Sequence, residues 1–500
     1  AEAAIAAEIE RIAPGVPVSL SSVVAPEFRE FERISTTVMN AYLTPITASY
    51  LRQLRRQVIE AGVASTVAVM RSSGGLMSLE AAADLPAAIL LSGPAGGVVA
   101  AQRLAEGLGL STTVSFDMGG TSTDVCLIED GAVDVSHERE IDGHACRMPA
   151  VGIHTVGAGG GSIAWIDAGG SLRVGPQSAG ADPGPACYGH GGTQPTVTDA
   201  NVVLGRIGAE TALGGSLSID ASLARDAVSA VGDALGLSTE DAAVGIVRIA
   251  EATMAGAVRT VLIDAGSDPT RAHLVAFGGA GGLHAAAVAR SLGMAGVVVP
   301  PFAGVFSAVG LLVSSPRTDA VAAIHVVGDD LGAARKAADG LVSSTSNAII
   351  DAGSAVDRTE LHLDLRYVGQ AHEVSVPWDG HLDMAGVVDH FEALHRKRYG
   401  FDRTGDPTEI MAVRCSAFGV PPLADIVHNP GSAESPMPGS RRVVAGAGEE
   451  ADAVVLQRPT LPVGFTFVGP AVIEEEQSTT WVDSDERFVV AGDGSLVITW

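Results

Sequence analysis

The chain has 500 residues, which is enough to bury a large core and to form two to four domains. Hydrophobic residues make up 47% of the chain and charged residues 18%, which indicates a globular protein and excludes a disordered one. The net charge of −27, with no extended basic cluster, excludes nucleic acid as the ligand, because its binders need a basic surface that displaces counterions.

The first hundred residues are predicted to alternate helices and short strands. Residues 1–12 have the pattern of the end of an amphipathic helix, and residues 16–20 that of a short strand. Residues 26–62 predict one or two helices broken near Pro45, followed by an apolar strand at 65–70. With the helix expected at 98–107, this succession is typical of α/β proteins.

The segment from Ser115 to Ile128, SFDMGGTSTDVCLI, is the most informative part of the chain. Strands at 113–116 and 125–128 would form a β-hairpin whose tip faces phosphate. Gly119 and Gly120 can take backbone angles closed to other residues and let the main chain approach a ligand closely. Consecutive backbone N–H groups at such a tip form an anion-binding nest, and hydroxyls come from Thr121 and Thr123.

Two acidic residues belong to this hairpin. Asp117 would repel phosphate, so its expected role is to hold a divalent cation, directly or through water. Asp124 is either a further site residue or a cap of its own turn, because aspartate in turns often bonds its own backbone.

Residues 150–205 form a glycine- and proline-rich insert. Long loops of this kind inside a compact chain are usually functional. His154, Asp182 and Asp199 are the candidates for the substrate side, as general base or as orienting group, and histidine suits proton transfer near neutral pH. Cys187 is a weaker candidate nucleophile, for which burial is the simpler explanation.

A second glycine-rich element, HLVAFGGAGGLHAA, spans residues 273–286. It predicts an apolar strand, a turn containing Gly278, Gly279 and Gly281, and a helix whose first N–H groups face a nucleotide. Together with the Asp-x-Gly-Gly-Thr hairpin, it resembles the actin, sugar kinase and heat-shock chaperone ATPase fold. In that fold the first element is the second phosphate loop, and the later element holds the adenosine.

The uncharged residues 291–315 are long enough to span a bilayer. The pair Pro300-Pro301 would interrupt a helix there, so a strand at 297–299, a loop and a helix at 305–312 are expected instead of a membrane span. The four cysteines, Cys126 among them as a buried and unreactive thiol, have no metal-binding or redox spacing. A reducing cytoplasm fits them best.

The remaining chain predicts helices at 222–235, 239–264 and 384–399, and strands at 360–365, 372–376 and 409–418. Residues 425–450 have the composition of a flexible connection, and the last fifty residues that of a β-rich module. We therefore expect an α/β protein of three consecutive domains: residues 1–110 as the remainder of an N-terminal actin-like half, 111–325 as the ATPase-type core with the insert at 150–205, and 326–500 as a C-terminal α+β module.

Several blocks closely resemble the hydantoinase A / oxoprolinase family: FDMGGTSTD at 116–124, IHTVGAGGGS at 153–162, SAGADPGPACYG at 178–189, FGGAG at 277–281 and GPAVIEEEQSTTWV at 469–482. The resemblance implies an ATP-dependent hydrolase that opens a cyclic amide or imide, with ATP and Mg²⁺ as cofactors and a hydantoinase B type subunit as partner. It assigns Mg²⁺ to Asp117, the β- and γ-phosphates to Gly119, Gly120 and Thr121, and the adenosine to the turn at 278–281.

The sequence departs from the family at one point. Family members carry an earlier Asp-x-Gly-Gly-Thr loop, whereas this sequence contains only the one at 117–121. An N-terminally truncated chain that binds ATP weakly is therefore expected.

Two other functions fit the same blocks. An acetone-type carboxylase subunit would phosphorylate an enolate or bicarbonate. A non-enzymatic actin-like protein would use the nucleotide to move domains or to polymerise, although the insert at 150–205 argues against such a switch.

Overall fold

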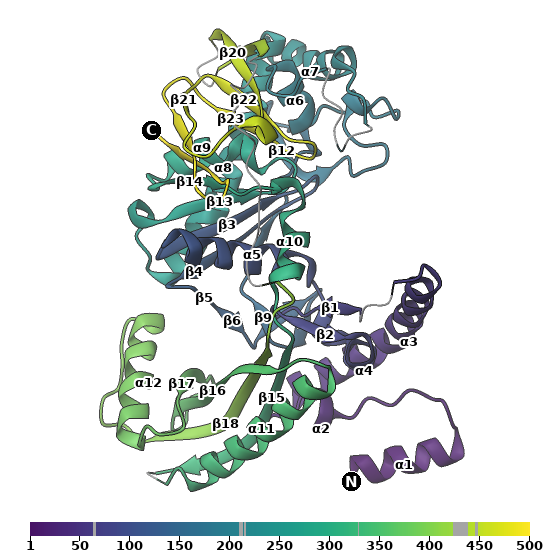
Figure 1. Cartoon of the computed structure of the whole chain (residues 1–500), viewed down its shortest axis with the longest axis vertical. Helices are drawn as coiled ribbons and strands as arrows, with labels where there is room; N and C mark the ends of the chain where they lie inside the picture. Colours follow the sequence, from purple (N-terminus) through teal and green to yellow (C-terminus); the bar gives the residue numbers. More distant parts are fainter. Residues whose placement is uncertain (64–66, 210–213, 215–216, 329, 424–438, 446–448) are drawn as a thin grey trace. The chain divides into compact units, whose positions relative to one another are not determined.

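The computed structural model describes residues 1–500 with the exception of 64–66, 210–213, 215–216, 329, 424–438 and 446–448. The chain forms two compact units (Figure 1), the first made of residues 1–96, 135–151 and 311–424 and the second of residues 97–134, 152–310 and 425–500. The three consecutive domains expected from the sequence differ from this division, because strands distant in the sequence pair with one another. Most of the connection expected at 425–450 lies outside the described residues.

The elements of the first unit are mainly helices and short hairpins, together with one long-stranded sheet. They are α1 (Glu2–Ile12), α2 (Ser21–Val24), α3 (Glu30–Glu60), β1 (Ala68–Met70), β2 (Leu76–Ser78), α4 (Leu79–Asp84), the 3-10 turn η1 (Pro86–Ile89), β6 (Val135–Ser136), β7 (Arg139–Ile141), β8 (His144–Cys146), β9 (Ala150–Val151), β15 (Arg317–Val327), α11 (Gly332–Asp351), β16 (Val356–Tyr367), β17 (Val374–Trp378), α12 (Met384–Tyr399) and β18 (Thr408–Gly419). The strand expected at 16–20 does not form.

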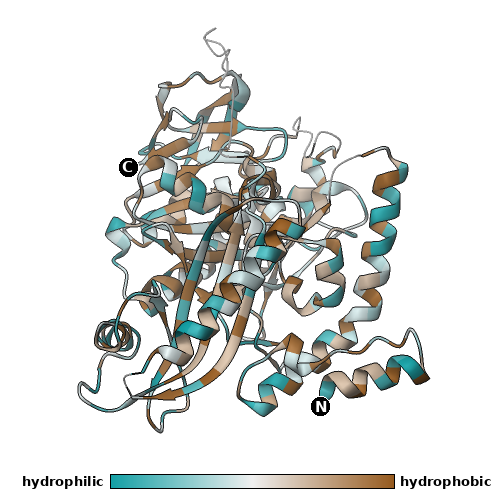
Figure 2. Cartoon of the chain, turned by 60° about the horizontal axis from the view of Figure 1, so that its bottom comes forward, coloured by the Kyte–Doolittle hydropathy of each residue, from teal (hydrophilic) through white to brown (hydrophobic). Residues whose placement is uncertain are grey.

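Helix α3 is continuous, so the break expected near Pro45 is wrong. A proline inside a helix costs about 3 kcal/mol, and packing on the inner side of α3 offsets that cost. Asn40 is fully buried there, where its amide nitrogen donates to the carbonyl of Asp84 and its Oδ1 accepts from the N–H of Ala87, both at 3.2 Å. Figure 2 shows that hydrophobic residues nevertheless recur along the whole length of the helix.

The sheet of the first unit has the strand order β15-β18-β16-β17, all antiparallel. One face is apolar and packs against α11 and α12. Its centre is formed by the fully buried Leu363, Leu365 and Tyr367 from β16 and by Phe391 from α12. Residues alternate between the faces of a strand, so the neighbours of these side chains point to the opposite face.

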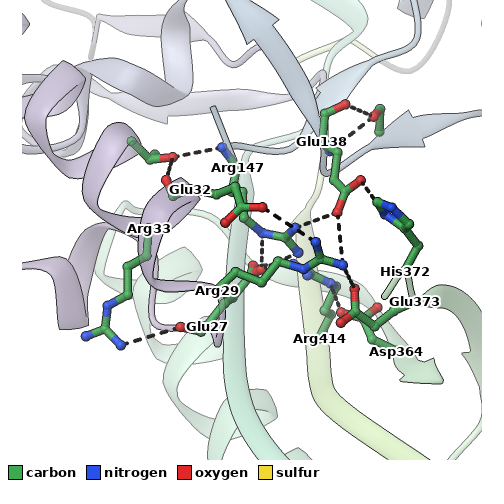
Figure 3. Close-up of polar contacts among 12 residues, drawn as sticks. Glu27, Arg29, Glu32, Arg33, Glu138, Arg147, Asp364, His372, Glu373 and Arg414 are labelled. Atoms are coloured by element: carbon green, nitrogen blue, oxygen red, sulfur yellow. Dashed lines mark hydrogen bonds and ion pairs between the residues drawn. The ribbon is translucent and has the colours of Figure 1, made fainter. Parts of the chain in front are cut away.

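That opposite face carries a network of charged side chains (Figure 3). Glu27, only 6% exposed, accepts from Nε of Arg147 at 2.7 Å and lies 3.0 Å from Nη1 of Arg414. Arg414 also donates to Asp364 at 2.8 Å, and Arg147 to Glu138 at 2.7 Å. Burial works to lower the pKa of the Arg414 guanidinium, but the carboxylates of Asp364 and Glu27 hold it above its usual range. The network ties the start of α3 and the hairpin of β7 and β8 to the sheet.

We predict that Glu27→Gln destabilises the protein by about 3–5 kcal/mol, because it leaves two buried guanidinium groups without their shared carboxylate. Urea denaturation followed by circular dichroism measures the change. The matched control is Glu8→Gln, which breaks an exposed pair with Arg11 and should leave the unfolding midpoint unchanged. Equal stability of the two variants would show that the network does not hold the unit together.

The second unit contains several helices that pack against one another and the largest sheet of the described residues. Its elements are β3 (Thr112–Met118), β4 (Thr123–Glu129), β5 (Ala132–Val133), β10 (His154–Val156), β11 (Ser162–Ile166), β12 (Leu172–Ser178), η2 (Ala186–Tyr188), α6 (Val197–Val203), α7 (Ala221–Leu235), α8 (Thr239–Ala265), η3 (Pro269–Arg271), β13 (His273–Phe277), α9 (Gly281–Ser291), β14 (Gly296–Val299), η4 (Ala303–Val305), β19 (Gly439–Val444), β20 (Glu450–Gln457), η5 (Arg458–Thr460), β21 (Thr466–Val468), β22 (Ala471–Glu474), β23 (Thr479–Val482), β24 (Arg487–Val490) and β25 (Leu496–Thr499). Helices α5 (Gly93–Leu108) and α10 (Phe306–Val313) each belong partly to both units.

The main sheet has the order β10-β4-β3-β13-β14-β25-β24-β21, with β5 paired to β4. Strands β3, β13 and β14 are parallel, whereas β4 runs antiparallel to β3 and β10 runs antiparallel to β4. Helix α8 packs against β4 and β10, and α9 against β13 and β14. The hairpin expected around Asp117 is therefore confirmed as β3 and β4.

The last fifty residues are rich in strands, as expected, but they do not stand apart from the core. Strand β25 pairs with β14 and thereby extends the main sheet. Strands β24 and β21 continue the main sheet beyond β25, and a second sheet, ordered β19-β20-β22-β23, contains the remaining C-terminal strands. This pairing explains why residues 425–500 belong to the same unit as the hairpin.

The uncharged segment 291–315 contains the buried strand β14 and the short helix α10, which confirms the strand and helix expected there. Among the residues that the structure describes, no helix has both the length and the hydropathy that a membrane crossing requires.

Candidate functional site

The parallel pairing of β3 and β13 brings two glycine-rich turns to one edge of the main sheet. Asp117 and Phe277 are partners in this register, so both strands end at the same level. The hairpin tip at 118–122 and the glycine turn at 278–281 follow directly, and the N–H of Ala280 donates to the carbonyl of Met118 at 3.2 Å. Ligands of open α/β sheets bind outside such carboxyl ends.

A third glycine-rich segment, residues 157–161, lies against the hairpin tip. The N–H of Gly160 donates to the carbonyl of Gly119 at 3.0 Å, and that of Gly161 to the carbonyl of Gly120 at 2.6 Å. A Cβ at Gly159 would lie 2.7 Å from the backbone nitrogen of Thr121, so only glycine fits this contact. The insert thus holds the tip of the hairpin in place.

The glycine positions of the site differ in whether their backbone angles and surroundings require glycine. Gly278 has a φ of +80°, and a Cβ there would lie 2.6 Å from Oδ1 of Asp117. Gly119 and Gly120 do not have positive φ, so the special backbone angles expected at these two positions are wrong. A Cβ at Gly120 would meet no atom within 4 Å, which means that this glycine leaves open space at the tip.

Asp117 and Asp124 form a pair of acids on one face of the hairpin, directly opposite each other in the register. Oδ2 of Asp117 accepts from the hydroxyl of Ser307 at 2.9 Å, and Oδ1 of Asp124 from that of Thr155 at 2.5 Å. Burial raises the pKa of Asp117 against the effect of the Ser307 hydroxyl, and the charge of Asp124 adds to the rise. Burial also raises the pKa of Asp124.

Among the described residues, no basic side chain is one of the groups that influence these two carboxyls. Two adjacent, largely buried carboxylates without a cationic neighbour fit a divalent cation, which would stabilise their charged forms. Within the part of the chain that the structure describes there is no group of three or more potential metal ligands. This donor set suits Mg²⁺, which proteins often bind through one or two carboxylates, the other ligands being water and substrate phosphates.

His154 is exposed on β10, but the register places it away from the acid pair. Thr155 is opposite Asp124, and His154 is opposite Val125. Since successive side chains of a strand point to opposite faces, His154 lies on the face that Asp117 and Asp124 do not use. Asp182 is exposed in the loop after β12.

Asp199 is completely buried and acts as part of the capping box of α6. Its carboxylate accepts from the N–H and hydroxyl of Thr196, and from the N–H groups of Ala186 and Cys187 at 3.2 and 2.8 Å. These donors account for both oxygens. Cys187 itself is fully buried, and burial and the charge of Asp199 raise the pKa of its thiol.

The threonines of the hairpin have different surroundings. Thr121 is exposed at the tip, whereas the buried hydroxyl of Thr123 donates to the carbonyl of Ala158 at 2.5 Å. Thr123 therefore fastens the hairpin to the insert. As expected, Cys126 is buried in β4, and burial raises the pKa of its thiol to about 12, so this thiol is unreactive at neutral pH.

Three residues that were not predicted from the sequence contribute to this edge. Ser307 reaches Asp117 from the start of α10, and Thr155 reaches Asp124 from β10. The backbone of Gln477 closes over the glycine turn, since Cβ atoms at Gly279 and Gly304 would lie 3.7 and 2.3 Å from its carbonyl oxygen. The alternation of β10 could have favoured Thr155 over His154 once its pairing with β4 was known. Ser307 carries no sequence signal, and Gln477 lies in the block at 469–482, whose position beside the glycine turn the sequence does not indicate.

Comparisons with known proteins identify relatives over the whole chain. The family model described as hydantoinase/oxoprolinase matches residues 33–320. The caprolactamase subunit alpha of Pseudomonas jessenii is 34% identical over 92% of this chain and 69% of that protein. The 5-oxoprolinase 1 of Arabidopsis thaliana is 31% identical over 96% of this chain and 40% of that protein.

Two solved structures resemble the fold. The crystal structure of the ATP-dependent caprolactamase from Pseudomonas jessenii matches with a TM-score of 0.86 and 32% identity, covering 100% of this chain and 74% of that one. The nucleotide-free structure of acetone carboxylase matches with a TM-score of 0.79 and 25% identity, covering 100% and 73%. Both support the α/β architecture described above.

We predict that Gly278→Ala destabilises the protein by about 2–3 kcal/mol, because alanine is strained at positive φ and its Cβ would overlap the end of β3. The neighbouring Gly279→Ala is the control and should change the unfolding free energy by no more than about 0.5 kcal/mol, as its Cβ has room. Thermal or urea denaturation of both variants measures the difference. A Gly278→Ala variant as stable as the control would contradict the close contact with Asp117.

Proposed function

The chain belongs to the hydantoinase/oxoprolinase family, and from this premise we propose that it is the ATP-dependent subunit of a hydrolase that opens a cyclic amide or imide of the hydantoin or oxoproline type. The observation that carries the proposal is the meeting of the acid pair and the glycine turns at one sheet edge. Gly278 is within contact distance of Asp117 and of the hairpin tip there, although it comes from a distant part of the sequence.

The strand order supports the nucleotide-binding half of an actin-like ATPase fold. A three-stranded antiparallel meander, β3, β4 and β10, is followed by β13 and β14, which run parallel to β3. In this proposal the hairpin tip is a phosphate loop, and the turn before α9 lines the adenosine. The N-terminal N–H groups of α9 would then add to the positive potential of the site.

Each part of the site has a role in this proposal. Asp117 and Asp124 would hold Mg²⁺, directly or through water. The backbone of Gly119, Gly120 and Thr121 would cradle the β- and γ-phosphates, because the tip is exposed and has room beside Gly120. The turn residues Gly278, Gly279 and Gly281 would line the adenosine.

An amide resists hydrolysis because its nitrogen donates electron density into the carbonyl. ATP, when bound, supplies the phosphoryl group that converts the carbonyl oxygen into a leaving group, so that water can open the ring. For such a transfer the protein mainly positions the reactants and neutralises charge. In this chain the glycine-rich segment 157–161 of the insert holds the hairpin tip through two backbone hydrogen bonds, and Ser307 orients the Asp117 carboxylate through its hydrogen bond.

The proposal leaves His154, Asp182 and Asp199 out of the catalytic set. His154 faces away from the acid pair, Asp182 has no described contact with it, and the oxygens of Asp199 are occupied within the fold. A general base for the ring-opening step therefore remains to be supplied by another residue or by the partner.

The names of several relatives describe them as subunits, which supports a partner subunit for this chain. The caprolactamase relative is a subunit alpha, and acetone carboxylase and acetophenone carboxylase relatives are beta and gamma subunits. We propose a hydantoinase B type subunit as the partner, and a cytoplasmic location, since all four cysteines are unpaired and buried.

The second candidate is an acetone-type carboxylase subunit, which the match to acetone carboxylase favours. Both activities would use the same nucleotide edge, so substrate-dependent phosphate release separates them. The complete complex is incubated with ATP and, in turn, with 5-oxoproline, hydantoin, caprolactam, or acetone plus bicarbonate. Release with a ring substrate supports the hydrolase, and release with only the ketone and bicarbonate supports the carboxylase.

We predict that Gly120→Ala weakens ATP binding at least tenfold while leaving the unfolding free energy unchanged, because the new methyl group enters open space that the phosphates would occupy. Isothermal titration calorimetry of the complete protein with a non-hydrolysable ATP analogue and Mg²⁺ measures the affinity. The control is Gly256→Ala on α8, which also adds a methyl group in open space but away from the site. Unaltered affinity of Gly120→Ala would remove the hairpin tip from the nucleotide site.

We also predict that Asp117→Asn lowers ATP hydrolysis by the complete complex at least a hundredfold and abolishes its dependence on Mg²⁺ concentration, because the cation loses a charged ligand. Steady-state phosphate release over a Mg²⁺ titration measures both effects. Asp226→Asn, an exposed substitution on α7, serves as the matched control. Unchanged hydrolysis with an unchanged Mg²⁺ profile would refute the metal assignment.

A further inference from the structure

Helix α3 presents a stripe of large hydrophobic side chains to solvent. The stripe consists of Phe31, Ile34, Val38, Tyr42, Ile46 and Tyr50, which are between 59% and 73% exposed. Their spacing of three and four residues places them along one side of the helix. They follow one another over about 30 Å, at a rise of 1.5 Å per residue.

The charge pattern of α3 sets this stripe apart from an ordinary solvated face. The sequence from Ile34 to Leu51 contains no charged residue at all. The outward face of a surface helix usually carries charged and polar residues, whereas here the exposed positions between the stripe residues are Ala41, Pro45 and Ser49. A face of this composition is typical of a surface that another polypeptide covers.

The area of the stripe is large enough for a specific interface. Six side chains of these sizes and exposures present on the order of 700 Å² of surface, somewhat more than the roughly 300–600 Å² of the largest apolar patch on a typical monomer. Each partner of a standard-size interface contributes about 800 Å². The stripe alone accounts for most of such a contribution.

The exposed charges nearest the two ends of the stripe are opposite in sign, whereas the half-buried Glu32 and Arg33 near its start pair within the chain, with Arg29 and Glu2. Glu30 is exposed immediately before it, in the first turn of α3, and Arg52 is exposed immediately after it. Midway between these two residues lies Ala41, which is also exposed and whose small side chain lets another helix approach closely. The charge pattern of α3 is therefore complementary to that of the same helix turned end to end.

We propose that α3 is a self-association surface and that its occupant is a second copy of this chain, packed antiparallel about a two-fold axis that passes near Ala41. A two-fold axis makes the same patch meet itself. Glu30 of each copy then lies opposite Arg52 of the other. The N-terminal half of each stripe packs against the C-terminal half of the other, with Phe31 and Ile34 facing Ile46 and Tyr50. The two ionic contacts at the ends set the antiparallel direction.

A hollow beside the stripe adds to this fit. It has a volume of about 310 Å³ and is lined in part by Ile5 and Val18, together with Ile34 and Val38 from the stripe. An aromatic ring from the second copy, such as Tyr50, has space there and would leave water in favour of an apolar surface. The surface offered to the second copy therefore includes the hollow as well as the ridge of α3.

Charge-reversal variants test the proposal in a way that distinguishes a second copy from any other occupant. In the full chain, Glu30→Arg alone should weaken dimerisation at least tenfold, because the introduced guanidinium would meet Arg52, and Arg52→Glu alone should do the same by placing two acids together. An equimolar mixture of the two variants should restore the dimer, since a contact between opposite charges is then available. Sedimentation velocity over a concentration series measures the masses, and circular dichroism confirms that both variants are folded.

A cysteine at the axis gives an independent measurement. The native cysteines are buried, so Ala41→Cys adds an accessible thiol. Mild oxidation should link two Ala41→Cys chains into a disulfide-bonded dimer, whereas Gln53→Cys, exposed on the same helix but away from the axis, should not form one. A monomeric parent chain across the concentration series, or variants whose mixture stays as monomeric as each alone, would overturn the proposal. A parent that associates only with a different polypeptide would overturn it as well.

Discussion

The candidate site depends on the parallel pairing of β3 and β13. These strands are far apart in the sequence, yet their register places Asp117 and Phe277 at the same level of the main sheet. Parallel strands direct their carboxyl ends to one edge, so whatever follows each strand is brought together there. The chain follows each of them with a glycine turn, and this combination of strand direction and turn composition produces an edge where the backbone is accessible.

Glycine performs two different tasks at this edge. Gly159 and Gly278 are glycines because neighbouring backbone or carboxylate atoms leave no space for a Cβ, and Gly278 also has a left-handed backbone. Gly120 is different, because its surroundings would accept a side chain. The stability of the fold does not require a glycine at position 120, so room for a ligand would explain it. The acid pair is similar, since burial raises the pKa of Asp117 and Asp124 and no basic group of the described residues compensates.

In the first unit, buried charged side chains determine how the elements attach to one another. Its sheet has an apolar face that packs on helices and a charged face whose groups are paired with one another. Buried charges of this kind are costly unless each has a partner, so they specify how α3 and the hairpin of β7 and β8 attach to the sheet. The attachment uses the inner side of α3 and leaves its hydrophobic stripe facing outward. A dimer formed through this stripe would not disturb the charged network.

Local sequence patterns were sufficient for most elements and for the family. The hairpin around Asp117, helices α7, α8 and α12 and the strand-and-helix nature of residues 291–315 agree with their periodicity and turn residues, which act over a few residues. The break at Pro45 was wrong, because the packing of α3 outweighs the local cost of proline. The resemblance blocks also identified the correct family, which the family model and the relatives confirm.

Tertiary structure alone decided which of the candidate residues meet. Pairing between β10 and β4 turned Thr155 toward Asp124 and His154 away from it, and a shift by one residue would have reversed that outcome. Asp199 became part of a cap, Ser307 reached Asp117, and the C-terminal strands joined the main sheet. Hydrogen bonds between segments that are distant in the sequence cause most of these results. A sequence encodes which residues favour strands and turns locally, but the choice of partner and register depends on the energy of the whole fold.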